Sequence, residues 1–290
     1  MPGAVLALRP WIPAARLQTK APVFFAFESE ATAKLRSLVA RNTGDTQIVA
    51  GGAETPRRQS QVRVTNLQGW IGGKDEGGEE VPTVAVIAHY DAAAVAPALA
   101  VGADSNGSGV IALLQLARAF RKLYAESKTH GGTNLLFVLS AAGRLNFAGT
   151  KHWLAHTDPQ IVSNIQVALC LDTIGSGDKL FLHTSKPMKD SGVASLFGTM
   201  QSAAADAGVP LQLVHKKINI SDPDISWEHE LFSRKRVLAA TLSRRASAEE
   251  PRGGLLDRAV DVEALARNTQ MLANTLARLV PPPPPLKRFL

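Results

Sequence analysis

The stretch TVAVIAHYDAAAVAPALAVGADSNGSG, residues 83–109, decides the fold that the sequence predicts. Its first part, from Thr83 to Ala88, is almost entirely apolar. Such a run is typical of a β-strand that is covered on both faces, as in a parallel sheet. His89 and Asp91 follow at once, and Asp104 comes in a loop rich in glycine, serine and asparagine. A central strand therefore delivers a histidine and two aspartates to one end of the predicted sheet.

The same pattern continues along the chain. Further strands are predicted at residues 134–140, 165–172, 179–183, 211–215 and 237–242, and helices at 108–124, 147–155, 192–207, 227–235 and 261–279. Alternating helices and apolar strands predict an α/β fold with a mostly parallel central sheet. Such sheets form their sites at the carboxyl ends of the strands.

The sequence divides into three parts. Residues 1–80 are punctuated by glycine and proline, with a strand predicted at 22–27, a helix at 29–41 and a strand within 62–72; residues 81–280 form the main domain, and residues 281–290 a proline-rich tail. We expect no membrane span, because no run approaches the roughly 18–20 apolar residues that a span needs. The apolar run before Arg9 is too short for a signal peptide.

The composition is that of a globular protein with a basic surplus. Apolar residues make up 45% and charged residues 20%, and the net charge is +7. The densest basic stretches are short (HKK at 215–217, SRKR at 233–236, RR at 244–245), which favours scattered surface charge and no direct nucleic-acid binding. A basic face that contacts ribosomal RNA is the alternative, and strong salt dependence of ribosome binding would reveal it. The single cysteine, Cys170, excludes an intramolecular disulfide and lies in an apolar run.

Four side chains of metal-binding type stand where strands end or loops begin: His89, Asp104, Asp172 and His229. Imidazole and carboxylate ligands in this mixture suit zinc or a similar divalent ion. Asp91, two residues after His89, has the spacing of an outer carboxylate that orients an imidazole. Taken singly, each histidine is more often an ordinary core or surface residue, and each aspartate a turn or helix-start residue. The set as a whole favours a metal site.

Segments from five places in the chain resemble, in the same order, the zinc aminopeptidase-like fold of peptidase family M28, and within it the nicastrin-like branch. They are AHYDAAAVAPALAVGADSNGSGV (88–110), NLLFVLSAAGRLNFAGTKHWL (134–154), LCLDTIG (169–175), VHKKINI (214–220) and WEHELFSRKRVLAATLS (227–243). The resemblance covers residues 81–280, and PVFFAFESEA at 22–31 resembles the end of a protease-associated-like region. It implies a three-layer sandwich with a mostly parallel central sheet, preceded by a remnant of that region.

In active members of the family, two zinc ions share a bridging aspartate. The resemblance implies one zinc on His89, Asp104 and Asp172, and a second on Asp104, His229 and a glutamate. In the family that glutamate and the general base form a Glu-Glu pair after the third strand. Here residues 127–157 contain no aspartate or glutamate.

The missing pair predicts a pseudo-peptidase that needs no cofactor, because a general base contributes roughly 10²–10⁴-fold to hydrolysis. The four metal-type residues would then be a vestigial zinc site. The alternative is a zinc-dependent aminopeptidase that takes its base from elsewhere. Glu228 and Glu230, on either side of His229, are the nearby candidates.

Within the nicastrin-like branch, the segments are most similar to the nicalin-like proteins. This implies a scaffold subunit of an endoplasmic reticulum membrane complex, the BOS complex, with the Nodal modulator protein and a small multi-pass membrane protein as partners. That complex acts with the translocon and the ribosome in multi-pass membrane protein biogenesis, and is linked to Nodal signalling. Nicalin-like proteins are longer at both ends, so we expect a fragment, a short isoform or an incomplete gene model. Of two glycosylation triplets, Asn219-Ile-Ser is the candidate, because Asn106-Gly-Ser lies inside the site loop.

Overall fold

The computed structural model describes residues 64–73, 81–94, 99–126, 128–250 and 252–280, with isolated positions between 29 and 37. In chain order its elements are β1 (Leu67–Ile71), β2 (Thr83–His89), η3 (Ala103–Ser108), α2 (Gly109–Ala125), β3 (Asn134–Ser140), α3 (Ala148–His156), α4 (Pro159–Ser163), β4 (Ile165–Leu171), β5 (Leu180–Thr184), α5 (Ser191–Asp206), β6 (Leu211–His215), α6 (His229–Arg234), β7 (Leu238–Ser243) and α7 (Val262–Leu279). The strand predicted at 22–27, most of the helix predicted at 29–41 and the tail at 281–290 lie outside the described residues.

The strands form one seven-stranded sheet in the order β1-β3-β2-β4-β7-β5-β6. The four central strands, β3, β2, β4 and β7, are parallel. β1 is antiparallel to β3, β5 is antiparallel to β7, and β6 runs parallel to β5. The prediction of a mostly parallel sheet is therefore confirmed. β1 joins the edge of this sheet although it comes from the region before residue 81.

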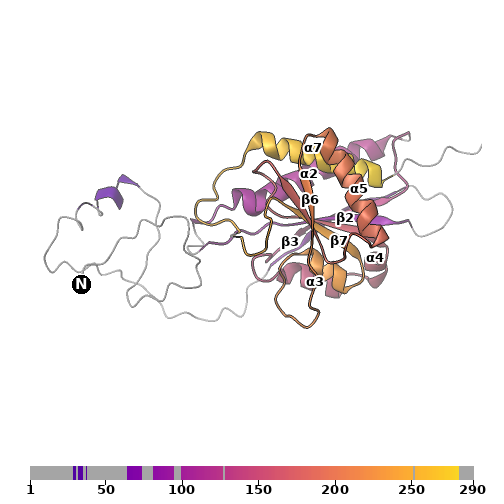
Figure 1. The fold of residues 1–290 in the computed structure, drawn as a ribbon, viewed down its shortest axis with the longest axis horizontal. Coiled ribbons are helices and arrows are strands. Elements are labelled where there is room, and N and C mark those ends of the chain that lie inside the picture. The colour runs from indigo at the N-terminus through magenta and orange to yellow at the C-terminus, as the bar shows by residue number, and fades with distance from the viewer. Residues whose placement is uncertain are drawn as a thin grey trace, which may run out of the picture.

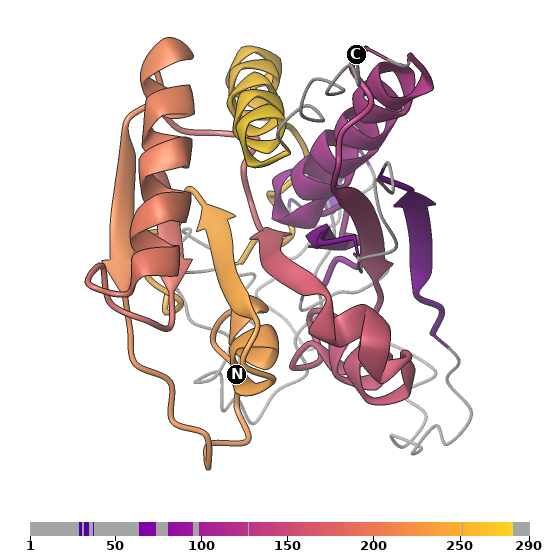
Figure 2. The ribbon, with the colours of Figure 1, turned by 90° about the vertical axis from the view of Figure 1, so that its right-hand side faces the viewer.

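Helices cover both faces of the sheet (Figure 1, Figure 2). α2, α5 and α7 lie on one side, and α3 and α6 on the other. Every residue of β2 is buried. Val84, Val86 and Ala88 belong to the core under α2, α5 and α7. Ala85 and Ile87 belong to the second core, with the buried Cys170. Burial on both faces explains why the strand sequence is continuously apolar.

The long C-terminal helix shows how the sequence sets an element and its face. The side chain of Asp261 accepts hydrogen bonds from the backbone N of Glu263 and Ala264, and so satisfies the free donors at the start of α7. Apolar residues at helical spacing are buried on one face of this helix: Leu265, Met271, Leu272 and Leu276. Within the described part of the chain, no helix combines the length and the apolar character that crossing a membrane requires.

The sheet register brings the carboxyl ends of the parallel strands together. His89 at the end of β2 pairs with Ser140 at the end of β3. Leu171 at the end of β4 pairs with Leu242 of β7. The residues that follow these strands therefore meet at one edge of the sheet, where α/β folds place their sites.

Candidate functional site

The four predicted ligand positions all lie at or near this edge. His89 is the last residue of β2, Asp104 lies in η3, Asp172 directly follows β4, and His229 begins α6. All four are buried, with exposed fractions between 0% and 5%. Polar groups buried to this extent need partners, and their partners show what the site can do.

The side chain of Asn106 ties the strand ends together. Its Nδ2 donates to the carbonyl oxygens of His89 (3.0 Å) and Leu171 (2.8 Å). Its Oδ1 accepts from the backbone N of Thr173 (3.0 Å). The buried amide is thus fully used and leaves no free group for a glycan. Asn219, by contrast, is exposed in the loop after β6.

Asp104 is held by groups from two distant segments. Its carboxylate accepts from the backbone N of Gly175 (2.7 Å), from the hydroxyl of Ser176, and from Nε of Arg244 (2.9 Å). The backbone N of Asp104 itself donates to Asp257 (2.8 Å). Its negative charge is therefore matched by a guanidinium and by oriented N–H and O–H donors.

Asp172 is bound by a second arginine. Nη1 of Arg245 donates to its Oδ2 (3.2 Å), Thr173 donates to its Oδ1 (2.7 Å), and Nε of Arg252 lies 3.8 Å away. Burial alone raises the pKa of a carboxyl, but Arg252, His89 and Arg245 outweigh it and lower the pKa of Asp172 to about 2. Asp172 is an anion at neutral pH.

The arginines are themselves enclosed. Arg245 is fully buried, and its guanidinium also donates to the carbonyl oxygens of Ala248 (2.7 Å) and Glu250 (2.6 Å). It lies 4.8 Å from the ring centre of Trp227, in a cation–π arrangement. Burial lowers the pKa of Arg245 to about 10, so this residue is a cation at neutral pH.

Two neutral histidines pack beside this pair. Nδ1 of His229 lies 2.8 Å from the hydroxyl of Thr241 on β7, and burial lowers the pKa of His229 to about 3. His183 stacks on Trp227 with 3.9 Å between ring centres, and its Nε2 donates to the carbonyl oxygen of Arg245 (2.8 Å). Burial lowers the pKa of His183 to about 4.

Glu228 and Glu230, the candidate replacement bases, are both engaged. Glu228 accepts from the hydroxyls of Ser140 (2.8 Å) and Thr150 (2.5 Å), and its Oε2 lies 3.9 Å from Nδ1 of His89. Glu230 accepts from the backbone N of Trp227 at the start of its own helix (3.0 Å). Nε2 of His89 is buried and has no hydrogen-bond partner among the residues that the structure describes.

Asp91 holds the loop that follows β3. Its carboxylate accepts from the backbone N of Gly143 (2.7 Å) and Arg144 (3.0 Å). The side chains near Nδ1 of His89, where an orienting carboxylate was predicted, are Asn106 and Glu228. Asp91 thus orders a loop of the site, and the loop brings in another cation, Arg144.

The residues present do not fit a zinc ion. Across the described ranges, no three His, Cys, Asp or Glu side chains converge as a metal site requires. Asp104 and Asp172 are each bound to a guanidinium. A divalent cation between these carboxylates would face Arg244 and Arg245 at close range, and repulsion between like charges opposes its entry.

Sequence reasoning missed these cations. The interpretation of RR at 244–245 as scattered surface charge is wrong for Arg245, which is fully buried. A signal was available, because both arginines directly follow the strand predicted at 237–242 and so reach the edge of the candidate ligands. Two further residues of the site, His183 and Trp227, were not singled out from the sequence, although His183 ends the strand predicted at 179–183 and Trp227 begins the segment 227–243 that carries the resemblance.

Comparisons with known proteins agree with this architecture. Residues 66–252 match the family model described as Peptidase family M28. The chain is 42% identical over 260 residues to the BOS complex subunit ncln of Danio rerio, covering 81% of this chain and 45% of that protein. It is 30% identical over 269 residues to Nicalin of Caenorhabditis elegans, covering 85% and 47%. The predicted resemblance to nicalin-like proteins is confirmed, and the chain spans about half the length of these curated relatives.

Among solved structures, the chain is similar to a zinc aminopeptidase from Bacillus subtilis. The TM-score is 0.58 with 20% sequence identity, and the match covers 74% of this chain and 50% of the aminopeptidase. At this identity the likeness shows a shared fold. The predicted α/β fold of the M28 type is therefore confirmed.

Proposed function

The chain belongs to peptidase family M28, and we propose that it is a non-catalytic member whose function lies in the proteins it binds. One observation carries this proposal: the two carboxylates that the resemblance assigns to metal binding are paired with guanidinium groups, Arg244 with Asp104 and Arg245 with Asp172. A metal hydrolase needs those oxygens free, because the metal activates water and polarises the scissile carbonyl.

The absence of a base supports the same conclusion. Residues 127–157, a stretch that contains β3 and the loop after it, have no aspartate or glutamate. Glu228, whose Oε2 lies 3.9 Å from Nδ1 of His89, is buried, and its Oε1 accepts hydrogen bonds from two hydroxyls. A general base must reach the water that it deprotonates, and Glu228 is only 2% exposed.

The relatives indicate what kind of scaffold this is. The Danio rerio relative is named as a subunit of the BOS complex, so we propose that this chain is a subunit of a complex of that type. In its finer form the proposal is a role at the endoplasmic reticulum membrane with the Nodal modulator protein and a small multi-pass membrane protein. There it would support multi-pass membrane protein biogenesis at the translocon. The 30% to 42% identity over most of the chain supports this assignment.

The direct test is aminopeptidase activity with added zinc, measured on a panel of aminoacyl substrates. The purified chain and its His89→Ala variant are compared. We expect both to stay at the background rate, because the site has neither a free ligand set nor a free base. A zinc-dependent rate that disappears in His89→Ala would overturn the proposal and establish the aminopeptidase alternative.

A further inference from the structure

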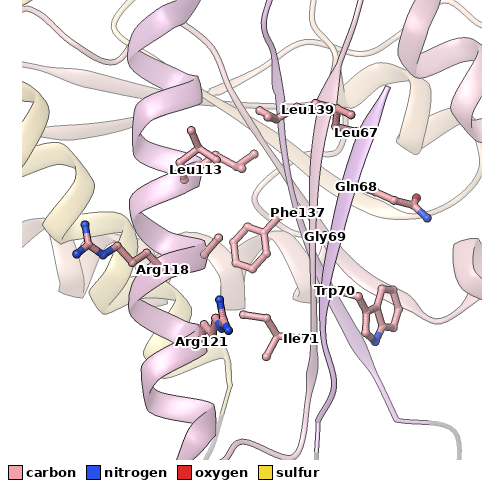
Figure 3. A pocket seen from close by; sticks show the side chains of 12 residues that line it. Leu67, Gln68, Gly69, Trp70, Ile71, Leu113, Arg118, Arg121, Phe137 and Leu139 are labelled. Atoms are coloured by element: carbon pink, nitrogen blue, oxygen red, sulfur yellow. The ribbon is translucent and has the colours of Figure 1, made fainter. Parts of the chain in front are cut away.

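A second feature of the molecule lies away from the metal-type residues. A groove of about 440 Å³ runs between the edge strand β1 and helix α2 (Figure 3). Its walls are apolar on the strand side and mixed on the helix side. They comprise Leu67, Gln68, Gly69, Trp70, Ile71, Phe137 and Leu139 from the strands, and Leu113, Leu114, Ala117, Arg118 and Arg121 from the helix.

The groove exists because the edge strand has a glycine at its centre. Strand alternation directs Leu67, Gly69 and Ile71 toward α2, and Gln68 and Trp70 away from it (Figure 3). A Cβ at Gly69 would meet no atom within 4 Å. The space above Gly69, between the aliphatic side chains of Leu67 and Ile71, is therefore open. We call this space the seat.

Apolar side chains around this seat are unusually exposed for a sheet face. Leu67 is 56% exposed on β1, and Leu114 is 52% exposed on α2. On the other side of α2 the sheet is covered by α5 and α7 (Figure 2). In the described part of the chain, the β1 end of the same face is apolar and has no covering helix beyond α2, as expected of a surface that a partner covers.

Two cations stand on the helix side of the groove. Arg118 and Arg121 lie one turn apart and continue the row that begins at Leu114. Within the described residues, neither guanidinium has an ion-pair or hydrogen-bond partner, in contrast to the paired arginines of the site. The groove therefore offers an apolar seat next to two unneutralised positive charges.

We propose that this groove binds an acidic amphipathic α-helix of a partner protein, which lies beside α2 and over β1. A helix fits because packed helices lie about 8–10 Å apart, so one more helix would continue the layer of α2, α5 and α7. Its apolar residues would occupy the seat at Gly69, and its carboxylates would meet Arg118 and Arg121. A strand added to the free edge of β1 would lie in the plane of the sheet and leave the groove empty.

This inference goes beyond the proposed function, because it concerns other residues and holds whether or not the chain has peptidase activity. The five residues of β1 span about 17 Å at roughly 3.3 Å per residue. A helix that covers this length has about 11 residues. A 16-residue peptide with a leucine stripe at helical spacing and glutamate elsewhere is a sufficient probe, and the same peptide with lysine in place of glutamate is its control.

The test measures binding of the fluorescein-labelled peptides to the intact chain by anisotropy. Gly69→Leu fills the seat and should weaken binding of the glutamate peptide at least tenfold. The melting temperature of this variant should equal or exceed that of the parent, because a glycine inside a strand is replaced. Arg118→Gln with Arg121→Gln should weaken binding about 3- to 10-fold at low salt, with a smaller effect at high salt. Lys122→Gln, on the same helix but outside the groove lining, should change binding less than twofold.

Several outcomes would overturn the inference. The lysine peptide could bind as tightly as the glutamate peptide, or Gly69→Leu could bind normally while remaining folded. A peptide of residues 29–41 of this chain could occupy the groove more tightly than the acidic probe, which would assign the groove to the chain itself. Vesicles containing phosphatidylserine could bind with the same dependence on Gly69, Arg118 and Arg121, which would assign it to a membrane. None of these outcomes bears on the peptidase test above.

Discussion

The Nε of Arg244 donates a hydrogen bond of 2.9 Å to Oδ2 of Asp104, across 140 positions of sequence. This contact joins the turn before α2 to the segment after β7, and Arg245 makes the equivalent link to Asp172. Buried carboxylates need a positive partner, which in active M28 members would be zinc. In this chain the guanidinium groups of Arg244 and Arg245 supply positive charge beside the two carboxylates.

The first prediction concerns the buried pair of Arg245 and Asp172. Arg245→Met removes the guanidinium and takes hydrogen-bond donors from Oδ2 of Asp172 and from the carbonyl oxygens of Ala248 and Glu250. Removing one partner of a buried ion pair destabilises a protein by about 3–5 kcal/mol. Urea unfolding measures this change, and Lys217→Met, at an exposed position, is the control with an expected change below about 0.5 kcal/mol. A loss of less than about 1 kcal/mol in Arg245→Met would show that the pair does not hold the site together.

The second prediction concerns zinc itself. Dialysis of the intact chain against zinc should leave it without stoichiometric metal, and zinc should not raise its melting temperature, because a ligand stabilises only the fold that binds it. Arg244→Ala frees Asp104 from its cation. Any zinc-dependent rise in melting temperature should therefore occur at a lower zinc concentration in this variant than in the parent. Metal analysis of the dialysed proteins measures zinc uptake, and thermal unfolding with and without zinc measures the change in melting temperature. The parent could instead take up one or two zinc ions and lose this uptake in His89→Ala. That result would contradict the interpretation that arginines take the place of zinc at this site.

The third prediction is a pH dependence that arises from His183. Burial lowers the pKa of this residue to about 4 in the folded state, against about 6.5 for an unfolded histidine. Between these values the unfolded chain binds a proton and the folded chain does not, so stability is lost as the pH falls below 6.5. The contribution of His183 to the free energy of unfolding should be about 2 kcal/mol lower at pH 5 than at pH 8.

His183→Gln removes this titration, so its unfolding free energy should fall less steeply between pH 8 and pH 5 than that of the parent. His152→Gln changes an exposed histidine and should leave the profile as it is. Denaturant unfolding at several pH values gives both profiles. Parallel curves for His183→Gln and the parent would mean that His183 takes up its proton in the folded state at an ordinary pH.

The positions of the strands were largely predictable, both for the buried central strands and for β6, which has no buried residue. The predicted bounds of β3 and β6 agree with the structure, and those of β4, β5 and β7 differ by one residue. Burial on both faces forces an apolar run, which the sequence displays directly. The direction of β5 was not predictable, because strand composition does not specify whether neighbours are parallel or antiparallel.

The candidate site was predictable only in part, for a related reason. His89 and Asp172 were found because both close apolar strands, and the ends of parallel strands meet. Their arginine partners were missed because pairing depends on which loops come together in space. Arg245 follows β7 and reaches the site, whereas the exposed Arg236 precedes the same strand, but this order along the chain does not say which carboxylate Arg245 will meet. Whether a buried aspartate is paired with an arginine depends on the tertiary structure. Here that pairing decides whether the predicted ligands can form a metal site.

The last prediction compares one substitution at two helical glycines. A Cβ at Gly149, near the start of α3, would lie 2.0 Å from the carbonyl oxygen of Ala141, whereas one at Gly198 in α5 meets nothing within 4 Å. Gly198→Ala should stabilise the protein by about 0.5–1 kcal/mol, because alanine is the better helix former. Gly149→Ala should destabilise it by about 1–3 kcal/mol or more, because α3 must move away from the end of β3.

The move would also carry Thr150 away from Glu228, to which its hydroxyl donates. The loss in Gly149→Ala should therefore shrink when Glu228 is already replaced by glutamine, since the neutral amide demands less from its donors. Thermal unfolding of the single and double variants measures this coupling. Equal losses in the parent and in Glu228→Gln would mean that the close approach of α3 to the end of β3 contributes to packing alone and does not hold Thr150 against Glu228.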